Sequence, residues 1–365
     1  MLLSLLSFLL VLSILVLVHE SGHYFMAKRA GVWVEEFGFG YPPRVWGKKV
    51  GETIYSINLL PFGGFVRLHG ENVEEGVTKP NRAFLHKSKS QRVKIIVAGV
   101  IMNFILGIVA FAIVYSIQGV PIITDKVKVV EVSAGSPAET SGIMVGDIIK
   151  SVDGDPVTSN EVFIKKIDEL KGREVKINLE RGSEPKEIIL IPRTEVPDNE
   201  GPVGVIITTS EVYFPPVWQR PFVGAYHGTK DALYWGKVIV MGLRDIFVQL
   251  FAGQAPRGIA GPIGIYALTS EAAKFGALTL INFVGILSIN LAVLNIIPFP
   301  ALDGGRLLFI VIESIFGRRV LPKIEAAFHF VGMVILLIAI VAITISDVRR
   351  LIVGGGIQGF LDSLM

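Results

Sequence analysis

The segment LLSLLSFLLVLSILVLV at positions 2–18 runs directly into HESGH at positions 19–23, and the rest of the chain is best understood from these two stretches. The first is uncharged and, with the residues that follow, long enough to cross a membrane as a helix. His19 and His23 are four residues apart, so on a helix they share one face and can bind one metal ion. Glu20 lies beside them and can take a proton from a water bound to that metal. The stretch therefore predicts a zinc-hydrolase motif at the end of a membrane span.

Two other interpretations fit this stretch less well. A bare H-E-x-x-H match also occurs by chance, and two histidines on a helix can simply hydrogen-bond to their neighbours. The position of the motif favours zinc, because polar side chains at the end of an apolar helix are costly to bury without partners or a function. A cleaved signal peptide at 1–18 is rejected, since the segment lacks a basic leading part and a small-residue cleavage site, and cleavage would strand the motif.

The composition of the 365-residue chain is that of a membrane protein. Hydrophobic residues make up 51% and charged residues 18%, whereas a soluble protein of this length would usually be more charged. The chain contains no cysteine, so disulfides and thiolate metal sites are excluded and any metal must be bound by histidine and carboxylate. The net charge of +3 is too small to indicate a nucleic-acid partner.

Apolar segments predict four membrane spans. We place them at 1–29, 95–120 and 275–305, and the fourth within 306–365, after a basic cytoplasmic loop. Basic residues after the first span and before the fourth place these ends in the cytoplasm by the positive-inside rule, with the N-terminus outside. A basic pair after the fourth span opposes this orientation, which we keep because the other loops agree.

Residues 30–94 are neither an apolar span nor a plain polar loop. Segments 53–58 and 65–68 alternate like strands around the turn at 61–64, which predicts a β-hairpin or small sheet at the membrane face, followed by a cytoplasmic loop. Backbone at membrane depth must be buried in protein or line a wet cavity, so a hairpin next to a metal site indicates substrate handling. Its exposed edge could pair with an extended peptide. The alternative is a sheet that only packs on the helices.

Two further regions lie between the second and third spans. Residues 121–206 form a water-soluble insertion whose spacing S-P-A-x-x-x-G-x-x-x-G-D-x-I, from Ser136 to Ile149, resembles a PDZ domain of the bacterial protease type. PDZ domains bind extended or C-terminal peptides along a strand edge, but the sequence does not say whether this one binds or obstructs. In 207–274, apolar residues at helical spacing with interspersed charges predict an amphipathic helix on the membrane surface and a linker.

The third span carries a second set of polar residues, in SINLAVLNIIPFPALDGGR at 288–306. Pro298 and Pro300 each lack a backbone donor, so the helix must break there. Broken membrane helices with polar residues at the break usually line a site instead of facing lipid. Asp303, followed by two glycines, is therefore the natural third metal ligand.

Other polar residues in the spans are less informative. Asn290 and Asn295 lie on different faces of the third span, so only one is expected to face the metal. Asn103, in the second span, either faces the metal cleft or bonds to a neighbouring helix, and the second interpretation is favoured. The histidines without paired spacing are interpreted as structural or surface residues: His69, His86, His227 and His329.

Together, H-E-x-x-H in a first span, N-x-x-P-x-P-x-L-D-G in a later one and the PDZ-like insertion between them resemble the site-2 protease family of intramembrane zinc metalloproteases, within it the bacterial regulators of sigma-E type. The resemblance covers nearly the whole chain, although the best-known members carry two PDZ domains and only one fits here. It implies that zinc is bound by His19, His23 and Asp303 and that Glu20 is the general base. It also implies that Asn295, beside Pro298 and Pro300, contacts the substrate or stabilises the transition state. The hairpin at 53–68 resembles the family's membrane re-entrant β-loop, and its Gly63 and Gly64 are expected to contact substrate as well.

The predicted fold is an α-helical polytopic membrane protein of about four transmembrane helices, with a membrane-associated β-hairpin and an inserted α+β PDZ domain. The predicted activity is zinc-dependent hydrolysis of peptide bonds within transmembrane segments. Expected partners are the lipid bilayer and single-span membrane proteins, such as an anti-sigma factor or signal-peptide remnants. The expected location is the bacterial inner membrane, with the PDZ domain on the extracytoplasmic side and the active site toward the cytoplasm.

Two functions from other classes fit the sequence less well. A catalytically silent PDZ-containing adaptor is disfavoured because two histidines, a glutamate and an aspartate of a complete zinc-hydrolase set occur together. A metal-ion transporter is conceivable because such residues in membranes also mark ion paths. Transporters commonly have repeated halves, and the sequence shows no second H-E-x-x-H and no internal symmetry.

Overall fold

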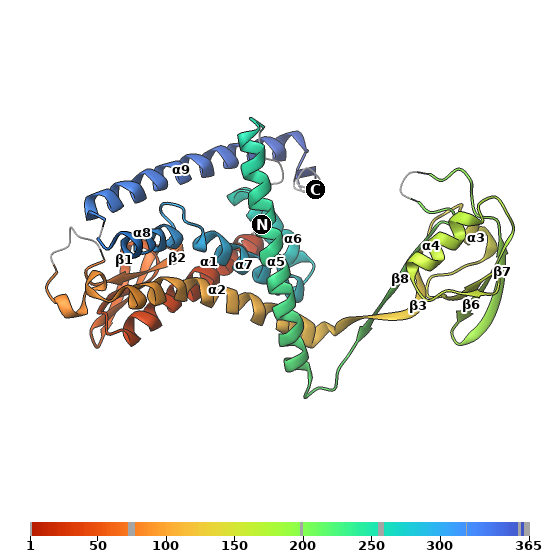
Figure 1. The fold of residues 1–365 in the computed structure, drawn as a ribbon, viewed down its shortest axis with the longest axis horizontal. Coiled ribbons are helices and arrows are strands. Elements are labelled where there is room, and N and C mark those ends of the chain that lie inside the picture. Colours follow the sequence, from red (N-terminus) through yellow and green to blue (C-terminus); the bar gives the residue numbers. More distant parts are fainter. Residues whose placement is uncertain are drawn as a thin grey trace. The chain divides into compact units, whose positions relative to one another are not determined.

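The computed structural model describes residues 2–71, 77–197, 200–254, 259–318, 320–356 and 359–360 (Figure 1). The chain forms two compact units, one from residues 1–117 with 217–365 and one from residues 118–216. Part of the predicted cytoplasmic loop after the hairpin, at 72–76, lies outside the described residues.

Four helices of the first unit are long and apolar enough to cross a membrane, counted over the described residues. They are α1 (Leu2–Arg29), α2 (Lys89–Gln118), α7 (Ala277–Ile296) and α9 (Pro322–Val353). Large apolar side chains on their outer faces are exposed, for example Leu6, Ile105 and Ile338. In water such a surface would be unfavourable, whereas lipid can cover it. The predicted helical membrane fold is confirmed.

Helices α1 and α2 approach each other closely at the H-E-x-x-H motif. A Cβ atom on Gly22 would lie 2.3 Å from the carbonyl oxygen of Ala98, which a real side chain could not do. Small residues at helix contacts let membrane helices pack with their backbones close together. The glycine inside the motif therefore brings α2 under the two histidines.

An antiparallel pair, β1 (Val34–Val50) and β2 (Thr53–Leu68), follows α1. The tight turn between the strands lies at Gly51 and Glu52, and Gly51 has a φ of 62°. Two-residue hairpin turns need such positive φ values, which glycine adopts without steric cost. The turn predicted at 61–64 is therefore not the turn of the hairpin.

The register of this sheet also differs from the prediction. Residues 36–39 pair with 54–57 on one side and with 64–67 on the other, while 44–50 pair with 53–58. The two predicted strands thus flank 36–39 instead of pairing with each other. Both alternate between apolar and polar residues, so the pattern alone fits either partner. Residues 64–67 form an edge, with no strand paired beyond them in the described part of the chain.

The predicted break in the third span is present. Helix α7 ends at Ile296, and α8 (Asp303–Phe316) begins after both prolines. A Cβ atom on Gly304 would lie 1.9 Å from the carbonyl oxygen of Ile297, so this glycine lets the broken segment fold back onto α8. The stretch from 306 onward, predicted as a basic loop, is helical to Phe316. Apolar residues at helical spacing, such as Ile310, pack in the core and outweigh the basic charges.

Two further helices of the first unit are α5 (Arg220–Phe251) and α6 (Pro262–Lys274), and 3-10 turns occupy Pro80–Arg82 and Phe84–His86. Helix α5 runs across α2 in Figure 1, and a Cβ atom on Gly228 would lie 2.7 Å from the carbonyl oxygen of Ile108. That α5 lies on the membrane surface stays a prediction.

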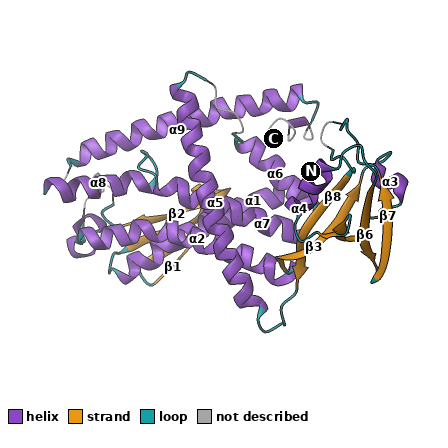
Figure 2. Cartoon of the chain, turned by 45° about the vertical axis from the view of Figure 1, so that its right-hand side comes forward, coloured by secondary structure: helices purple, strands orange, loops and turns teal. Residues whose placement is uncertain are grey.

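The second unit is the predicted PDZ domain (Figure 2). Its six-stranded sheet has the order β7-β6-β4-β3-β8, with β5 beside β4. Buried apolar residues of the strands and of α4 form its core, among them Val127, Ile149, Phe163 and Ile177. The elements are β3 (Val120–Val132), α3 (Pro137–Ser141), β4 (Ile148–Val152), β5 (Asp155–Pro156), α4 (Asn160–Glu169), β6 (Val175–Arg181), β7 (Glu184–Leu190) and β8 (Val205–Tyr213).

Local signals explain the short elements of this unit. The Ser136 hydroxyl caps α3 by accepting from the backbone N–H of Glu139, and Gly142, with a φ of 86°, ends that helix. The compact unit runs from 118 to 216, beyond the predicted 121–206, because β8 pairs with β3 as far as Tyr213.

Candidate metal centre and cavity

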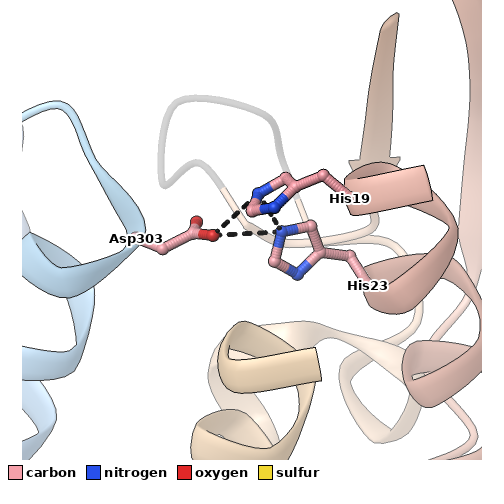
Figure 3. A group of neighbouring side chains, drawn as sticks. All are labelled: His19, His23 and Asp303. Carbon is pink, nitrogen blue, oxygen red and sulfur yellow. Dashed lines mark hydrogen bonds and ion pairs between the residues drawn. The ribbon is translucent and has the colours of Figure 1, made fainter. Parts of the chain in front are cut away.

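Figure 3 shows His19 and His23 of α1 directed at Asp303, the first residue of α8. The Nε2 atoms of the two histidines lie 3.0 Å and 3.1 Å from the same carboxylate oxygen, Oδ2 of Asp303. The two Nε2 atoms are 3.1 Å apart. All three side chains are largely buried. Three potential metal ligands from segments far apart in the sequence therefore meet at one point.

The chemistry of these donors fits a zinc ion. The carboxylate oxygen is buried, and its contacts to the imidazoles lack hydrogen-bond geometry within the described residues. The Nδ1 atom of His23 lies 2.9 Å from the carbonyl oxygen of Ile95, so Nδ1 carries the proton and Nε2 keeps its lone pair. Two imidazole nitrogens and one carboxylate oxygen are a donor set of catalytic zinc sites, whose bonds of about 2.0–2.2 Å bring ligand atoms this close together.

The site opens into a cavity of about 500 Å³. Its lining includes Glu20, Gly64, Arg306 and His329 together with the three candidate ligands. The edge segment of β2, including Phe65 and Val66, forms one wall, so an unpaired strand edge lies beside the metal centre. Glu20 is half-buried in the lining of the same cavity, and in the sequence it directly follows His19 and precedes His23 by three residues.

Only some of the residues predicted to contact substrate line this cavity. Gly64 lines it, whereas Gly63 adopts a φ of 78° in the bend of β2 beside the ring of Tyr41. Asn295 is half-buried in the last turn of α7, and neither it nor the two prolines belongs to the cavity lining among the described residues. Their contact with substrate stays a prediction.

His329 and Arg306 both line the cavity, although neither was predicted to do so. His329, interpreted from sequence as structural or surface, lines the cavity, and its Nδ1 accepts from the backbone N–H of Ala301 at 3.1 Å. Arg306, predicted in a loop, lies one turn after Asp303 and forms an ion pair with Glu71. No sequence pattern could have found His329, because its place depends on how α9 packs against the broken segment.

Comparison with protein families agrees with this arrangement. A model of peptidase family M50 matches residues 7–339, nearly the whole chain. The chain belongs to peptidase family M50. It is therefore a membrane-embedded zinc metalloprotease of the site-2 protease type, as the sequence predicted.

Individual relatives extend this comparison. The zinc metalloprotease RasP of Oceanobacillus iheyensis is 28% identical over 423 positions, covering 94% of this chain and 98% of that one. The regulator of sigma-W protease RasP of Bacillus subtilis is also 28% identical, with the same coverage of 94% and 98%. A PDZ domain of an SdrC-like protein from Listeria monocytogenes is 28% identical over 24% of this chain and 90% of that one, with a TM-score of 0.21.

Proposed function

We propose that His19, His23 and Asp303 bind the zinc ion of this M50 metalloprotease and that Glu20 is its general base. The observation that carries the proposal is the triangle of Nε2, Nε2 and Oδ2 atoms with sides of 3.0–3.1 Å. The composition supports it, because without cysteine only imidazoles and carboxylates can bind zinc tightly.

The proposed mechanism assigns proton transfer to Glu20. When bound, zinc lowers the pKa of a water molecule and polarises the peptide carbonyl. Glu20 takes the proton of the attacking water and returns it to the leaving amine. The bond from His23 to the carbonyl oxygen of Ile95 keeps that imidazole oriented throughout.

We propose that the substrate enters the cavity as an extended strand. A peptide bond inside a helix has its carbonyl engaged in a hydrogen bond, so a transmembrane substrate must unwind before it can be cut. The free edge at 64–67 lies at the cavity and can supply the hydrogen bonds that the unwound segment loses. Asn295, Pro298 and Pro300 are proposed to contact this strand from the other side.

The proposed substrates are single-span membrane proteins, such as a membrane-anchored regulator of a sigma factor, or signal-peptide remnants. The name of the Bacillus subtilis relative supports the first of these. Lys28 and Arg29, at the motif end of α1, support an active site toward the cytoplasm of a bacterial inner membrane and a PDZ domain on the other side.

The test is cleavage of a single-span substrate by the reconstituted protein, with bound zinc measured in each variant. Glu20→Gln should keep zinc and lose activity by about 10²- to 10⁴-fold, the range for a general base. Asp303→Ala should lose zinc. The matched control is Ser21→Ala, which should retain both properties, because within the described part of the chain the Ser21 hydroxyl bonds back to the carbonyl oxygen of Leu17 and to no candidate site residue. Equal cleavage by Glu20→Gln and the parent would contradict the role of Glu20, and full zinc binding by Asp303→Ala would contradict the ligand set.

A further inference from the structure

Asn103 of α2 has a completely buried side chain that faces His19. Its Nδ2 atom lies 3.4 Å from Nδ1 of His19, and its Oδ1 atom is buried with no hydrogen-bond partner among the described residues. A buried amide oxygen without a donor is unfavourable by about 1–3 kcal/mol. Asn103 lies in an uncharged span, where water cannot readily satisfy it.

The tautomer of His19 resolves this mismatch. If Nε2 of His19 binds a metal through its lone pair, Nδ1 must carry the proton and act as a donor. The N–H of His19 Nδ1 would then face the N–H of Asn103 Nδ2, and two donors cannot form a hydrogen bond with each other. A half-turn of the carboxamide, which exchanges two atoms of nearly equal size, brings Oδ1 opposite the Nδ1 proton. Oδ1 and the Nδ1 proton of His19 then pair with each other, and the Nδ2 group takes the place that Oδ1 held.

We propose that Asn103 is a positioning residue of the zinc site, whose Oδ1 accepts from Nδ1–H of His19 and holds the lone pair of Nε2 toward Asp303. The proposal rests on the ligand assignment made above. His23 is held in the same way by the carbonyl oxygen of Ile95. Helix α2 thus supplies one acceptor to each histidine, and acceptors of this kind fix the ring orientation and tautomer of metal-binding histidines.

The spacing on α2 supports this role. Ile95, Gly99 and Asn103 are each four residues apart and so lie on one face of the helix. A Cβ atom on Gly99 would lie 2.5 Å from Nε2 of His23 and 2.8 Å from Cε1 of His19. The glycine leaves room for both imidazoles between the two acceptors.

The backbone of Asn103 is fixed independently of its side chain. The hydroxyl of Ser288, a completely buried residue of α7, donates to the carbonyl oxygen of Asn103 at 2.7 Å. This bond joins α2 to α7 and does not involve the amide. It therefore allows helix packing and histidine positioning to be tested separately.

The test measures the zinc dissociation constant by competition with a chelator in the detergent-solubilised full chain. Asn103→Leu removes the acceptor and should weaken zinc binding about 10- to 100-fold. Asn103→Asp keeps an acceptor oxygen and should stay within a few-fold of the parent. Ser288→Ala removes only the contact to the backbone and should also stay within a few-fold. Parental affinity in Asn103→Leu, or an equal loss in Ser288→Ala, would overturn the proposal.

A second measurement detects the hydrogen bond itself. In the zinc-loaded chain, with the ring nitrogens of histidine labelled, NMR should show the Nδ1 proton of His19 shifted downfield by its bond to Oδ1 of Asn103, and zinc-loaded Asn103→Leu should lack that shift. The same Nδ1 proton signal in both chains would overturn the proposal. Failure of the ligand assignment gives a different result, because zinc affinity would then be unchanged in His19→Ala. Loss of zinc in His19→Ala with parental affinity in Asn103→Leu would contradict the role of Asn103 alone.

Discussion

The carboxylate of Glu313, in the last turn of α8, lies 2.5 Å from the guanidinium of Arg92, in the first turn of α2. Both side chains are nearly buried. This ion pair holds the C-terminal end of α8, the helix that begins with Asp303. A second ion pair, between Arg306 and Glu71, holds its N-terminal end. The third candidate ligand is thus carried by a helix that is held at two points.

Breaking the ion pair between Arg92 and Glu313 should destabilise the fold. We expect Arg92→Met to lower the free energy of unfolding by about 3–5 kcal/mol, because the buried carboxylate of Glu313 loses the guanidinium that balances its charge. The double variant with Glu313→Leu should recover most of that loss, because the buried charge is removed as well. Thermal unfolding with and without zinc measures both effects. Equal stability of Arg92→Met and the parent would rule out an anchoring role for the pair.

The close approach of α1 and α2 at Gly22 predicts strong sensitivity to size. We expect Gly22→Ala to cost about 1–3 kcal/mol by overpacking, because its Cβ would lie 2.3 Å from the carbonyl oxygen of Ala98. It should also weaken zinc binding, since α2 would move away from the histidines. Ser21→Ala adds no atoms and serves as the control. Unfolding temperature and bound zinc are the measurements, and identical values for the two variants would argue against tight packing here.

Removing the metal should lower both the activity and the stability of the protein. Chelation is expected to abolish cleavage and lower the unfolding temperature, and added zinc should restore both. The stabilisation at zinc concentrations about 100 times the dissociation constant should approach about 2.7 kcal/mol. Asp303→Asn, which loses the anionic donor, should show a much smaller zinc-dependent gain. An equal gain in that variant would place the bound zinc elsewhere.

The PDZ domain should lose stability in acid through Asp147. Burial alone would raise the pKa of this carboxyl, but hydrogen bonds from Arg181 and from the backbone N–H of Met144 lower its pKa below the ordinary 3.8. A carboxyl with a lowered pKa in the folded state stabilises the fold above its unfolded-state pKa. This contribution is lost as the pH falls through the folded-state pKa. We therefore expect protection of this domain against amide hydrogen exchange to decline below about pH 4.

A matched pair of variants separates this effect from general acid sensitivity. Arg181→Met should cost about 1.5–3 kcal/mol at pH 7, because Asp147 loses a bidentate charged partner, and should flatten the decline in acid. Lys150→Met removes an exposed ion pair with Glu180 and should change stability by less than about 1 kcal/mol. Equal losses in the two variants, measured by exchange in the full chain, would contradict the assignment.

Some of the site could be predicted from sequence because its signals are local or chemically rare. His19 and His23 share a helix face by spacing alone, and an aspartate after a proline-broken span has few other uses. The fold class followed from apolar length. The sheet register did not, because 53–58 and 65–68 both alternate between apolar and polar residues, and this pattern does not say which strand each one pairs with.

Residues that act through contacts between helices could not be placed in this way. Basic residues after Asp303 suggested a loop, although the apolar residues of α8 recur at helical spacing within the same segment. The amide of Asn103 was expected to bond to a neighbouring helix and not to face the metal cleft, whereas its Nδ2 atom lies 3.4 Å from Nδ1 of the candidate ligand His19. His329 has no spacing signal, because its position depends on the path of the chain between α7 and α8.

The chain enters and leaves the PDZ domain as one two-stranded ribbon, in which Val120 pairs with Tyr213. Its entry and exit points are therefore neighbours, and a two-residue turn could join them if everything between were removed. The contacts of Gly224 and Gly228 with α2 lie outside that ribbon and would survive such a deletion. The unit at 118–216 is thus inserted at a single point of the chain. Evolution could therefore add, duplicate or remove it in one step without changing the membrane helices that carry the candidate ligands.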